Sequence, residues 1–415
     1  MKKLPTCSNS SGTPLRPDLG RAELEGESVN RTKTRVCLIT AGHWSAVMGG
    51  IQYQVKCLVE QMIRDGGFEI FYLARLVDPF YRPKGYTMVP IAGNDRSLKK
   101  VFIQDAPKVF RLLKAIDPDV IYQKGLNSYT GIGAYYARSN PCPFIFHIAS
   151  DYDVTPLNKQ KVSWHRGLAW VEKKIGAYGL KSADWIVAQT EGQQRLLHRH
   201  YGMKASLLIP NFHPFPKEPI QKHHPPIKVI WVANFKPVKR PEMFVRLAED
   251  LGDEVNARFI MIGRPGDAKH YHKLHARIAG TKNLTYLGEL PIDRVNEILS
   301  GSHIFVNTSI VEGFPNTFIQ AWMRKMPVVT AGVDPDGILE GEGLGFSNAS
   351  YGHLRDAVRR LIHDDRLRER MGERAQAYAF RRFSTANVAP LLDLMKKTPP
   401  KGPSNLNTEV QEFSH

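Results

Sequence analysis

The sequence predicts an α/β protein made of two Rossmann-like domains that face a cleft. Short apolar runs alternate with helical patterns along most of the chain, and this alternation favours parallel sheets covered by helices. A proline-rich segment interrupts the alternation once, near the middle of the chain. The 415 residues also exceed what one compact core usually holds, so two domains are expected.

The first domain is predicted over residues 33–212. A buried strand at 35–40 leads through a glycine-containing loop into a helix at 51–64, whose apolar residues recur at helical spacing. The alternation continues with a helix at 107–116 and with strands at 119–122, 143–148, 185–188 and 207–209. Residues 1–32 are rich in Ser, Gly, Pro and Glu without periodicity, so they are predicted to be a disordered tail.

The second domain is predicted over residues 227–385, after a linker at 213–226 that contains five prolines. Its predicted strands are 228–232, 258–262, 285–287, 304–307 and 328–330, and its predicted helices are 241–251, 292–299, 316–324, 352–362 and 364–380. We leave open that the last helix packs back on the first domain. Residues 396–415 resemble the first tail in composition and are predicted to be disordered.

The charge balance points to an anionic partner. With 57 Lys and Arg against 40 Asp and Glu, the net charge is +17, which suits nucleic acid, an anionic membrane or an anionic substrate. No zinc-finger, RNP or basic-zipper pattern is present, so nucleic acid is not expected as a partner. No apolar run is long enough to span a bilayer, the start of the chain is a poor export signal, and the four cysteines lack CxxC spacing. We therefore expect a cytoplasmic protein.

The stretch from Asn307 to Trp322 is the most informative candidate site. A strand ends near Asn307, a Glu-Gly-Phe-Pro turn follows, and a helix opens near Asn316, where unpaired N–H groups can bind phosphate. Glu312 precedes this anion site and can accept hydrogen bonds from ligand hydroxyls, and Gln320 lies one turn into the helix, within reach of a ribose. The candidate residues are Glu312, Gly313, Phe314, Pro315, Asn316, Thr317 and Gln320. The alternative is that Glu312 only caps the helix and Pro315 is an ordinary first-turn proline.

A second candidate is the loop after the strand at 228–232, which carries Asn234, Lys236 and Lys239. Cations on one loop suit a diphosphate whose negative charge grows in the transition state. The alternative is that these lysines are solvated surface charges.

Two further candidates lie in the first domain. Gly49 and Gly50 join the first strand to the first helix and allow a backbone to approach a ligand closely, although Gly-Gly is often only a turn. The loop lacks a GxGxxG pattern, so no dinucleotide cofactor is expected. His147 ends an apolar strand, at the sheet edge where ligands of such folds bind. Its alternative role is that of a packed, hydrogen-bonded core residue.

These motifs resemble the retaining GT-B glycosyltransferases of the group-1, family 4-like type, over about residues 35–385. The family signature is Glu-Gly-x-Pro followed by a second Glu eight positions after the first. Glu312 begins a matching stretch, whereas Gln320 stands where the ribose-binding Glu is typical. The family also has an Arg followed five residues later by a Lys; Asn234 replaces the Arg, Lys239 matches the Lys, and Lys236 can supply the missing cation.

The resemblance implies a retaining hexosyltransferase that moves a sugar from a nucleotide-sugar to a glycan or lipid-linked acceptor in polysaccharide or glycolipid biosynthesis. Glu312, Lys239 and His147 are implied to be catalytic, and the Gly49–Gly50 loop is implied to face the donor phosphate and acceptor. The resemblance further implies front-face attack in which the leaving phosphate helps to deprotonate the acceptor, so no metal or other cofactor is expected. The substitutions at Gln320 and Asn234 leave open a nucleotide-sugar-binding protein without catalysis, and a nucleotide-sugar epimerase on this fold is a third alternative.

Two weaker patterns concern metal and membrane. An Asp-x-Asp pair at Asp151 and Asp153 resembles a metal-binding motif of other glycosyltransferases, but similar pairs occur elsewhere in the chain as in ordinary turns. Basic residues interleave with Trp, Tyr and Leu in residues 157–181 and again in 195–204. This pattern suits peripheral contact with an anionic membrane, and the alternative is ordinary solvated helix faces.

Overall fold

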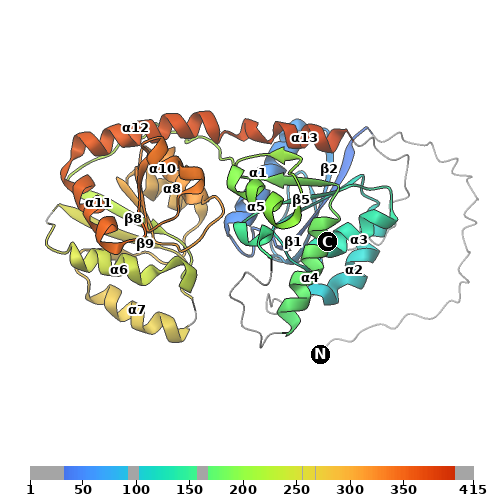
Figure 1. The fold of residues 1–415 in the computed structure, drawn as a ribbon, viewed down its shortest axis with the longest axis horizontal. Coiled ribbons are helices and arrows are strands. Elements are labelled where there is room, and N and C mark those ends of the chain that lie inside the picture. Colours follow the sequence, from blue (N-terminus) through green and yellow to red (C-terminus); the bar gives the residue numbers. More distant parts are fainter. Residues whose placement is uncertain (1–31, 92–101, 157–166, 255, 267, 398–415) are drawn as a thin grey trace, which may run out of the picture.

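The structure is a computed structural model that describes residues 32–91, 102–156, 167–254, 256–266 and 268–397. Two lobes lie side by side along the long axis of the molecule (Figure 1). Each lobe contains one parallel sheet covered by helices. The predicted pair of α/β domains is confirmed.

Within the described residues, the N-terminal domain has a seven-stranded sheet in the order β3-β2-β1-β4-β5-β6-β7, with every pairing parallel. Its strands are β1 (Thr34–Gly42), β2 (Phe68–Leu76), β3 (Thr87–Pro90), β4 (Val120–Lys124), β5 (Phe144–His147), β6 (Trp185–Ala188) and β7 (Leu207–Leu208). Its helices are α1 (Gly50–Asp65), α2 (Ala106–Ile116), α3 (Ser128–Ser139), α4 (Gly167–Lys181) and α5 (Glu191–Tyr201). Apolar residues fill both sheet faces, as in β1, where Val36, Cys37, Leu38 and Ile39 are fully buried.

Over the same described part of the chain, the C-terminal domain has a six-stranded parallel sheet in the order β10-β9-β8-β11-β12-β13. Its strands are β8 (Ile227–Val232), β9 (Ala257–Ile262), β10 (Leu284–Tyr286), β11 (Ile304–Asn307), β12 (Val328–Thr330) and β13 (Gly345–Ser347). Its helices are α6 (Pro241–Asp250), α7 (Ala268–Gly280), α8 (Ile292–Ser300), α9 (Asn316–Trp322), α10 (Ile338–Gly341), α11 (Tyr351–His363) and α12 (Asp365–Arg382).

Both sheets place their first strand beside the fourth strand in sequence order, so β1 neighbours β4 and β8 neighbours β11. The strand order reverses at these pairs, and the crevice outside their carboxyl ends is where doubly wound sheets bind ligands. The loops that leave β1, β4, β8 and β11 therefore form the expected site.

The chain returns to the first domain at its end. After α12, the helix α13 (Ala389–Lys396) buries Leu391, Leu392 and Met395 against the apolar core formed by β1, β2 and α1, and the two helices run along one edge of both lobes (Figure 1). The sequence places the start of the second tail at residue 396, whereas Lys396 ends α13 and its ammonium lies 2.6 Å from the Asp65 carboxylate. Residues 1–31 of the first tail and residues 398–415 lie outside the described residues.

Several polar contacts join the two domains directly. The Asp336 carboxylate accepts backbone N–H groups from Glu191 and Gly192 at the start of α5, at 3.1 and 2.8 Å. Where the linker begins, the His213 backbone N–H donates to the Phe383 carbonyl, just beyond α12, at 2.9 Å. The two segments that connect the domains, the linker and the segment after α12, therefore contact each other.

Candidate active site

A cavity of about 590 Å³ lies between the domains, at the carboxyl ends of both sheets. Residues from the loops after β1, β4 and β5 form one wall, and residues from the loops after β8 and β11 form the other. Twelve sequence-predicted residues line it: Gly49, Gly50, Asn234, Lys236, Lys239, Glu312, Gly313, Phe314, Pro315, Asn316, Thr317 and Gln320. Two regions more than 180 positions apart in the chain are thus brought to one site.

Glu312 and Lys239 form an ion pair on the C-terminal wall. The same carboxylate accepts a hydrogen bond from the Ser309 hydroxyl at 2.7 Å, which fixes its orientation. Lys239 is held by its neighbour Arg240, whose guanidinium donates to the carbonyls of Thr308 and Ala331 at 2.6 and 3.0 Å. Arg240 therefore ties the loop after β8 to the loop after β11 and brings the two predicted motifs together.

Asn234 has a positioning role in this structure. Its side-chain oxygen accepts the Arg264 backbone N–H at 3.2 Å, and the Arg264 guanidinium forms a two-pronged ion pair with Glu289 at 2.7 and 2.8 Å. Lys236 lines the cavity with an exposed side chain. The position where the family typically has an Arg is thus occupied by an uncharged residue that fastens one loop to the next.

The stretch that begins at Glu312 differs in part from expectation. The helix α9 spans only Asn316–Trp322, shorter than the predicted 316–324. A helix of two turns sums few peptide dipoles, so the positive charge for a phosphate has to come mainly from lysines. Gln320 is buried and its amide nitrogen donates to the Asn296 side chain at 2.9 Å, so its oxygen is the atom left to accept a ribose hydroxyl.

The glycines of the site permit close approach of the two domains. The Asn316 side chain donates to the Gly50 carbonyl and accepts from Gln54, both at 2.9 Å, so it bridges the domains. A side chain at Gly313 would place its Cβ 2.7 Å from the Ala149 carbonyl oxygen, closer than real contacts allow. Gly313 therefore has to be glycine for the domains to meet as they do.

His147 is buried and does not line the cavity, which differs from the predicted position beside the reaction centre. Its Nδ1 is hydrogen-bonded to the Tyr122 hydroxyl at 2.8 Å. Its Nε2 is buried and has no hydrogen-bond partner among the described residues. Burial, together with the nearby charge of Lys124, holds the pKa of His147 well below its usual value, so the ring is neutral.

Lys124 is a cavity residue that the sequence reasoning missed. It ends β4, pairs in register with His147 of β5, and lines the cavity although only 4% of the residue is exposed. Burial lowers the pKa of Lys124 to about 7, and the charge of Asp153 opposes part of that shift. The rule that selected His147, a polar residue at the carboxyl end of an apolar strand, also applies to Lys124.

The Asp-x-Asp pair serves the local backbone. Asp153 accepts the backbone N–H groups of Ala149 and Ser150 at 2.7 and 3.1 Å, which fixes the turn after β5. Over the described ranges, no cluster of three or more His, Cys, Asp or Glu residues is arranged to hold a metal ion. Asp153 therefore has a structural role in this turn.

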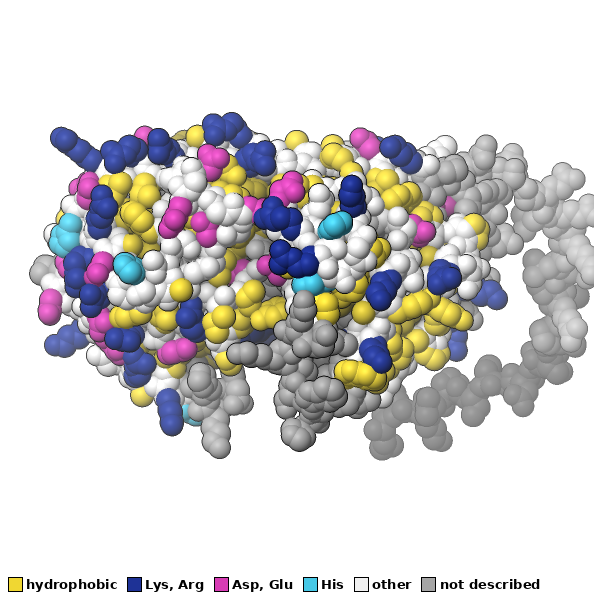
Figure 2. All heavy atoms as spheres, viewed as in Figure 1, with side chains coloured by type: hydrophobic (Ala, Val, Ile, Leu, Met, Phe, Trp, Pro, Cys, Tyr) yellow, Lys and Arg dark blue, Asp and Glu magenta, His cyan; other side chains and the backbone are white. Residues whose placement is uncertain are grey.

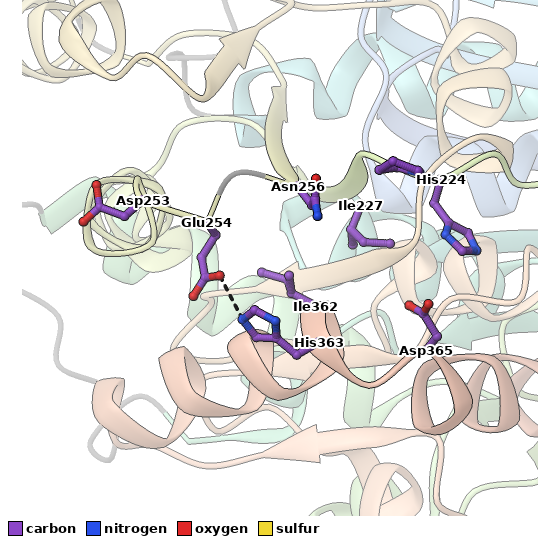
Figure 3. Close-up of a pocket in the computed structure, with 9 residues that line it drawn as sticks. His224, Ile227, Asp253, Glu254, Asn256, Ile362, His363 and Asp365 are labelled. Atoms are coloured by element: carbon purple, nitrogen blue, oxygen red, sulfur yellow. Dashed lines mark ion pairs between the residues drawn. The ribbon is translucent and has the colours of Figure 1, made fainter.

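A second cavity, of about 480 Å³, lies at the opposite ends of the strands. It is lined by residues of the linker, of the segment before β9 and of the end of α11, and Ile227 begins β8 there. Figure 3 shows His363 and Glu254 pointing toward each other across it, with 2.8 Å between their nitrogen and oxygen. It lies at the amino ends of β8 and β9, away from the edge where such sheets bind ligands.

The fold and the site define a GT-B protein, with two parallel-sheet domains and one cavity between their carboxyl edges. The solved structure of sucrose-phosphate synthase from Thermosynechococcus elongatus is similar, with a TM-score of 0.70, 14% identity, and coverage of 88% of this chain and 99% of that one. Anabaena HepE in complex with UDP and glucose is also similar, with a TM-score of 0.67, 15% identity, and coverage of 88% and 100%.

Family models define the class more closely. The model "Glycosyltransferase Family 4" matches residues 48–213, and the model "Glycosyl transferases group 1" matches residues 214–378. The chain therefore belongs to the group 1, family 4 glycosyltransferases.

Two curated relatives match part of the chain. D-inositol 3-phosphate glycosyltransferase of Corynebacterium glutamicum (strain R) is 29% identical over 40% of this chain, and N-acetyl-alpha-D-glucosaminyl L-malate synthase of Bacillus anthracis is 24% identical over 39%. The match spans about two fifths of the length of each relative, 41% and 42%.

Proposed function

We propose that the protein transfers a hexose from a nucleotide-sugar to a glycan or lipid-linked acceptor, with retention of configuration at the anomeric carbon. The single observation that carries this proposal is the Lys239–Glu312 pair on one cavity wall, opposite the Gly49–Gly50 loop of the other domain. A cation for the diphosphate and a carboxylate for the sugar thereby lie on one wall, and the acceptor wall faces them. The likeness to a protein whose solved structure contains UDP and glucose supports a nucleotide-sugar donor.

The donor would be bound by an exchange of partners. Lys239 forms an ion pair with Glu312. A donor diphosphate offers Lys239 a stronger anionic partner, and the released Glu312 carboxylate then accepts hydrogen bonds from sugar hydroxyls. Lys236 adds a second cation, and the oxygen of Gln320 accepts from the ribose. As charge grows on the departing diphosphate, both lysines stabilise it in the transition state.

Retention follows if the acceptor attacks from the face that the diphosphate leaves. The departing phosphate oxygen then takes the acceptor proton, so the reaction requires neither a metal nor a second carboxylate. Further closure of the domains around Gly313 would exclude water, which otherwise hydrolyses the donor. The reaction would serve polysaccharide or glycolipid biosynthesis.

The donor is tested by a thermal-shift screen of uridine, guanosine and adenosine diphosphate sugars, because a bound ligand raises stability by mass action. The sugar that binds is then offered with acceptors, and NMR of the product reads its anomeric configuration. We expect transfer with retention, and Lys239→Ala to lose it while the exposed control Lys282→Ala does not. Tight binding without turnover would instead favour a nucleotide-sugar-binding protein, and isomerised donor without transfer would favour an epimerase.

We further propose peripheral contact with the inner face of the cytoplasmic membrane through α4. Trp170 and Tyr178 of this helix are 45% and 38% exposed, and the Lys174 ammonium lies 3.8 Å from the Trp170 ring centroid. Aromatic rings beside lysines suit an anionic lipid surface. Lys159, Lys161, Trp164 and Arg166, which belong to the predicted basic run, lie outside the described residues.

On the face of the molecule seen in Figure 2, basic side chains also lie outside α4. Figure 2 shows Lys and Arg side chains over both domains, several of them along α12, so the positive excess is not confined to α4. No helix in the described ranges is long and apolar enough to cross a membrane. Flotation with vesicles of phosphatidylcholine, with and without phosphatidylserine, tests the proposal. We expect binding only to the anionic vesicles and its loss in Trp170→Ala/Lys174→Ala; equal binding by that variant would contradict the α4 surface.

A further inference from the structure

Lys124 is a buried lysine whose side-chain nitrogen has no partner among the described residues. Its side chain comes from the last residue of β4, at the point where the strand order of the N-terminal sheet reverses. For the described part of the chain, no hydrogen bond or ion pair within 4.0 Å is found for its ammonium, and the residue is 4% exposed. A buried charge is costly unless it is paired, so this position is explained best by a partner that arrives with a ligand.

The nearby carboxylate does not fill that role. Asp153 interacts electrostatically with Lys124 but is not within ion-pair distance. Its oxygens already accept the backbone N–H groups of Ala149 and Ser150 and lie near the Ser150 hydroxyl, at 2.7, 3.1 and 3.4 Å. The N–H donors of the Lys124 ammonium therefore remain available to a group bound in the cavity.

Neutral polar residues and one carboxylate, that of Asp153, line the cavity near Lys124. Cavity-lining polar groups near the end of β4 and the turn after β5 include Asn127 and Ser150, and α3 begins just after Asn127. The orphaned Nε2 of His147 lies on the adjacent residue of β5. Hydroxyls of a neutral sugar can hydrogen-bond an ammonium, but they cannot balance its charge.

We propose that Lys124 binds a carboxylate or phosphate carried by the acceptor, and that it selects anionic over neutral acceptors. The inference rests on the proposed function, because it assigns the acceptor to the N-terminal wall. The donor diphosphate has its own cations, Lys236 and Lys239, on the opposite wall. A second anion brought by the acceptor would meet Lys124 instead, and the two negative groups would be held apart by the cavity.

The test uses acceptor pairs that share a scaffold and differ in one anionic group: glucose against glucuronate and glucose 6-phosphate, and inositol against inositol 1-phosphate. Transfer from the donor found in the thermal-shift screen is measured for each. We expect kcat/KM for an anionic member to exceed that of its neutral partner at least tenfold in the wild type. Glucuronate tests a carboxylate and the two phosphorylated acceptors test a phosphate, so the results show which anionic group is preferred.

Three variants make the test specific. In Lys124→Met, the ratio of kcat/KM for the anionic acceptor to that for its neutral partner should fall close to one. Lys124→Arg should keep most of the wild-type ratio because the charge remains. The exposed control Lys114→Met should keep all of it. Urea unfolding of Lys124→Met should remain cooperative, with a midpoint no lower than that of the wild type, which shows that the variant is folded.

The outcomes distinguish this inference from the proposed function. If the wild type neither hydrolyses nor transfers any donor, the proposed function fails. If the donor is consumed but neutral and anionic acceptors react equally, or Lys124→Met keeps the preference, only the acceptor inference fails. If no member of the panel accepts sugar, L-malate and inorganic phosphate are titrated into protein saturated with the nucleoside diphosphate of the donor found in the screen. Absence of binding, or binding that does not weaken at least tenfold in Lys124→Met, overturns the inference.

Discussion

The two walls of the cavity differ in how the side chains of Glu312, Lys239 and Lys124 are paired. On the C-terminal wall Glu312 pairs with Lys239 and Ser309, and the Gln320 amide nitrogen donates to Asn296. On the N-terminal wall Lys124 is 4% exposed and its ammonium has no hydrogen-bond or ion-pair partner among the described residues, and the Nε2 of His147 is buried without a hydrogen-bond partner there.

Paired and unpaired groups have different energetic consequences for the protein. Groups that are paired before the ligand arrives are held in place, so their contribution appears in the rate when charge develops near them. Groups that are buried and unpaired destabilise the empty protein, and a ligand that pairs them recovers that free energy on binding. Loss of a residue from the C-terminal wall should therefore cost activity, whereas loss of Lys124 should raise stability.

The largest expected effect is on the C-terminal wall. Lys239→Met removes the cation that we assign to the leaving diphosphate, and we expect kcat to fall by about 10²–10³. The unfolding free energy should change by less than about 1 kcal/mol, because the pair with Glu312 is partly exposed. Steady-state kinetics and urea unfolding measure both quantities. Unchanged kcat, or an equal loss in Lys282→Met, would remove Lys239 from the site.

The second prediction concerns Gly313, where the C-terminal domain meets Ala149 of the N-terminal domain. Gly313→Ala places a methyl group against Ala149, so the domains cannot approach as closely, and misplacement near 1 Å can cost about 10²-fold in rate. We expect kcat/KM to fall at least tenfold. A Cβ at Gly341 meets nothing within 4 Å, so Gly341→Ala is the matched control. Wild-type rates in Gly313→Ala would show that the walls need not meet so closely.

The third prediction concerns stability on the N-terminal wall. Lys124→Met should raise the unfolding free energy at pH 7, because it removes an unpaired buried ammonium. Burial lowers the pKa of Lys124 to about 7, so between about pH 7 and the ordinary lysine pKa near 10.4 the unfolded chain binds more protons than the folded protein. Wild-type stability therefore rises with pH through that window relative to the variant.

The advantage of Lys124→Met should consequently shrink by about 1.4 kcal/mol per pH unit within the window. Urea unfolding of both proteins at pH 7, 8 and 9 measures it. A constant difference, or a variant that is less stable at pH 7, would mean that the ammonium has a partner in the free protein.

The smallest expected effect is that of metal removal. If Lys236 and Lys239 supply the positive charge for the diphosphate, EDTA should leave turnover within about twofold of the untreated rate. Restoration of lost activity by Mg²⁺ or Mn²⁺ after chelation would contradict this and return attention to Asp151 and Asp153.

The fold was largely accessible from the sequence, because its strands are continuous apolar runs. Predicted strands at 185–188, 304–307 and 328–330 match β6, β11 and β12 at both ends. The strand β2 was missed because Glu69 and Arg75 interrupt its apolar run, and α3 was missed because its glycines weaken a helical pattern. Those glycines serve packing: a Cβ at Gly131 would lie 2.4 Å from the Ile175 backbone of α4.

The C-terminal wall was more predictable than the N-terminal wall for a physical reason. Glu312 and Gln320 stand in one motif with recognisable spacing, and Lys239 stands in another, so local sequence identifies them. The N-terminal wall depends on which strand ends at the cavity and on which side chains remain unpaired there. His147 was assigned to the correct sheet edge, but its burial could not be read from the sequence, and Lys124 was overlooked beside it.

The hydrogen bond between His213 and Phe383 has a mechanical consequence. The linker and the end of α12 cross between the domains at this one point, and each crossing continues into packed structure on both sides. Two covalent connections that meet at one pivot oppose sliding and separation of the lobes, but they allow rotation. Donor binding and product release would then need only a rotation of one domain relative to the other about this point. The interdomain hydrogen bonds of Asn316 and Asp336 would break first.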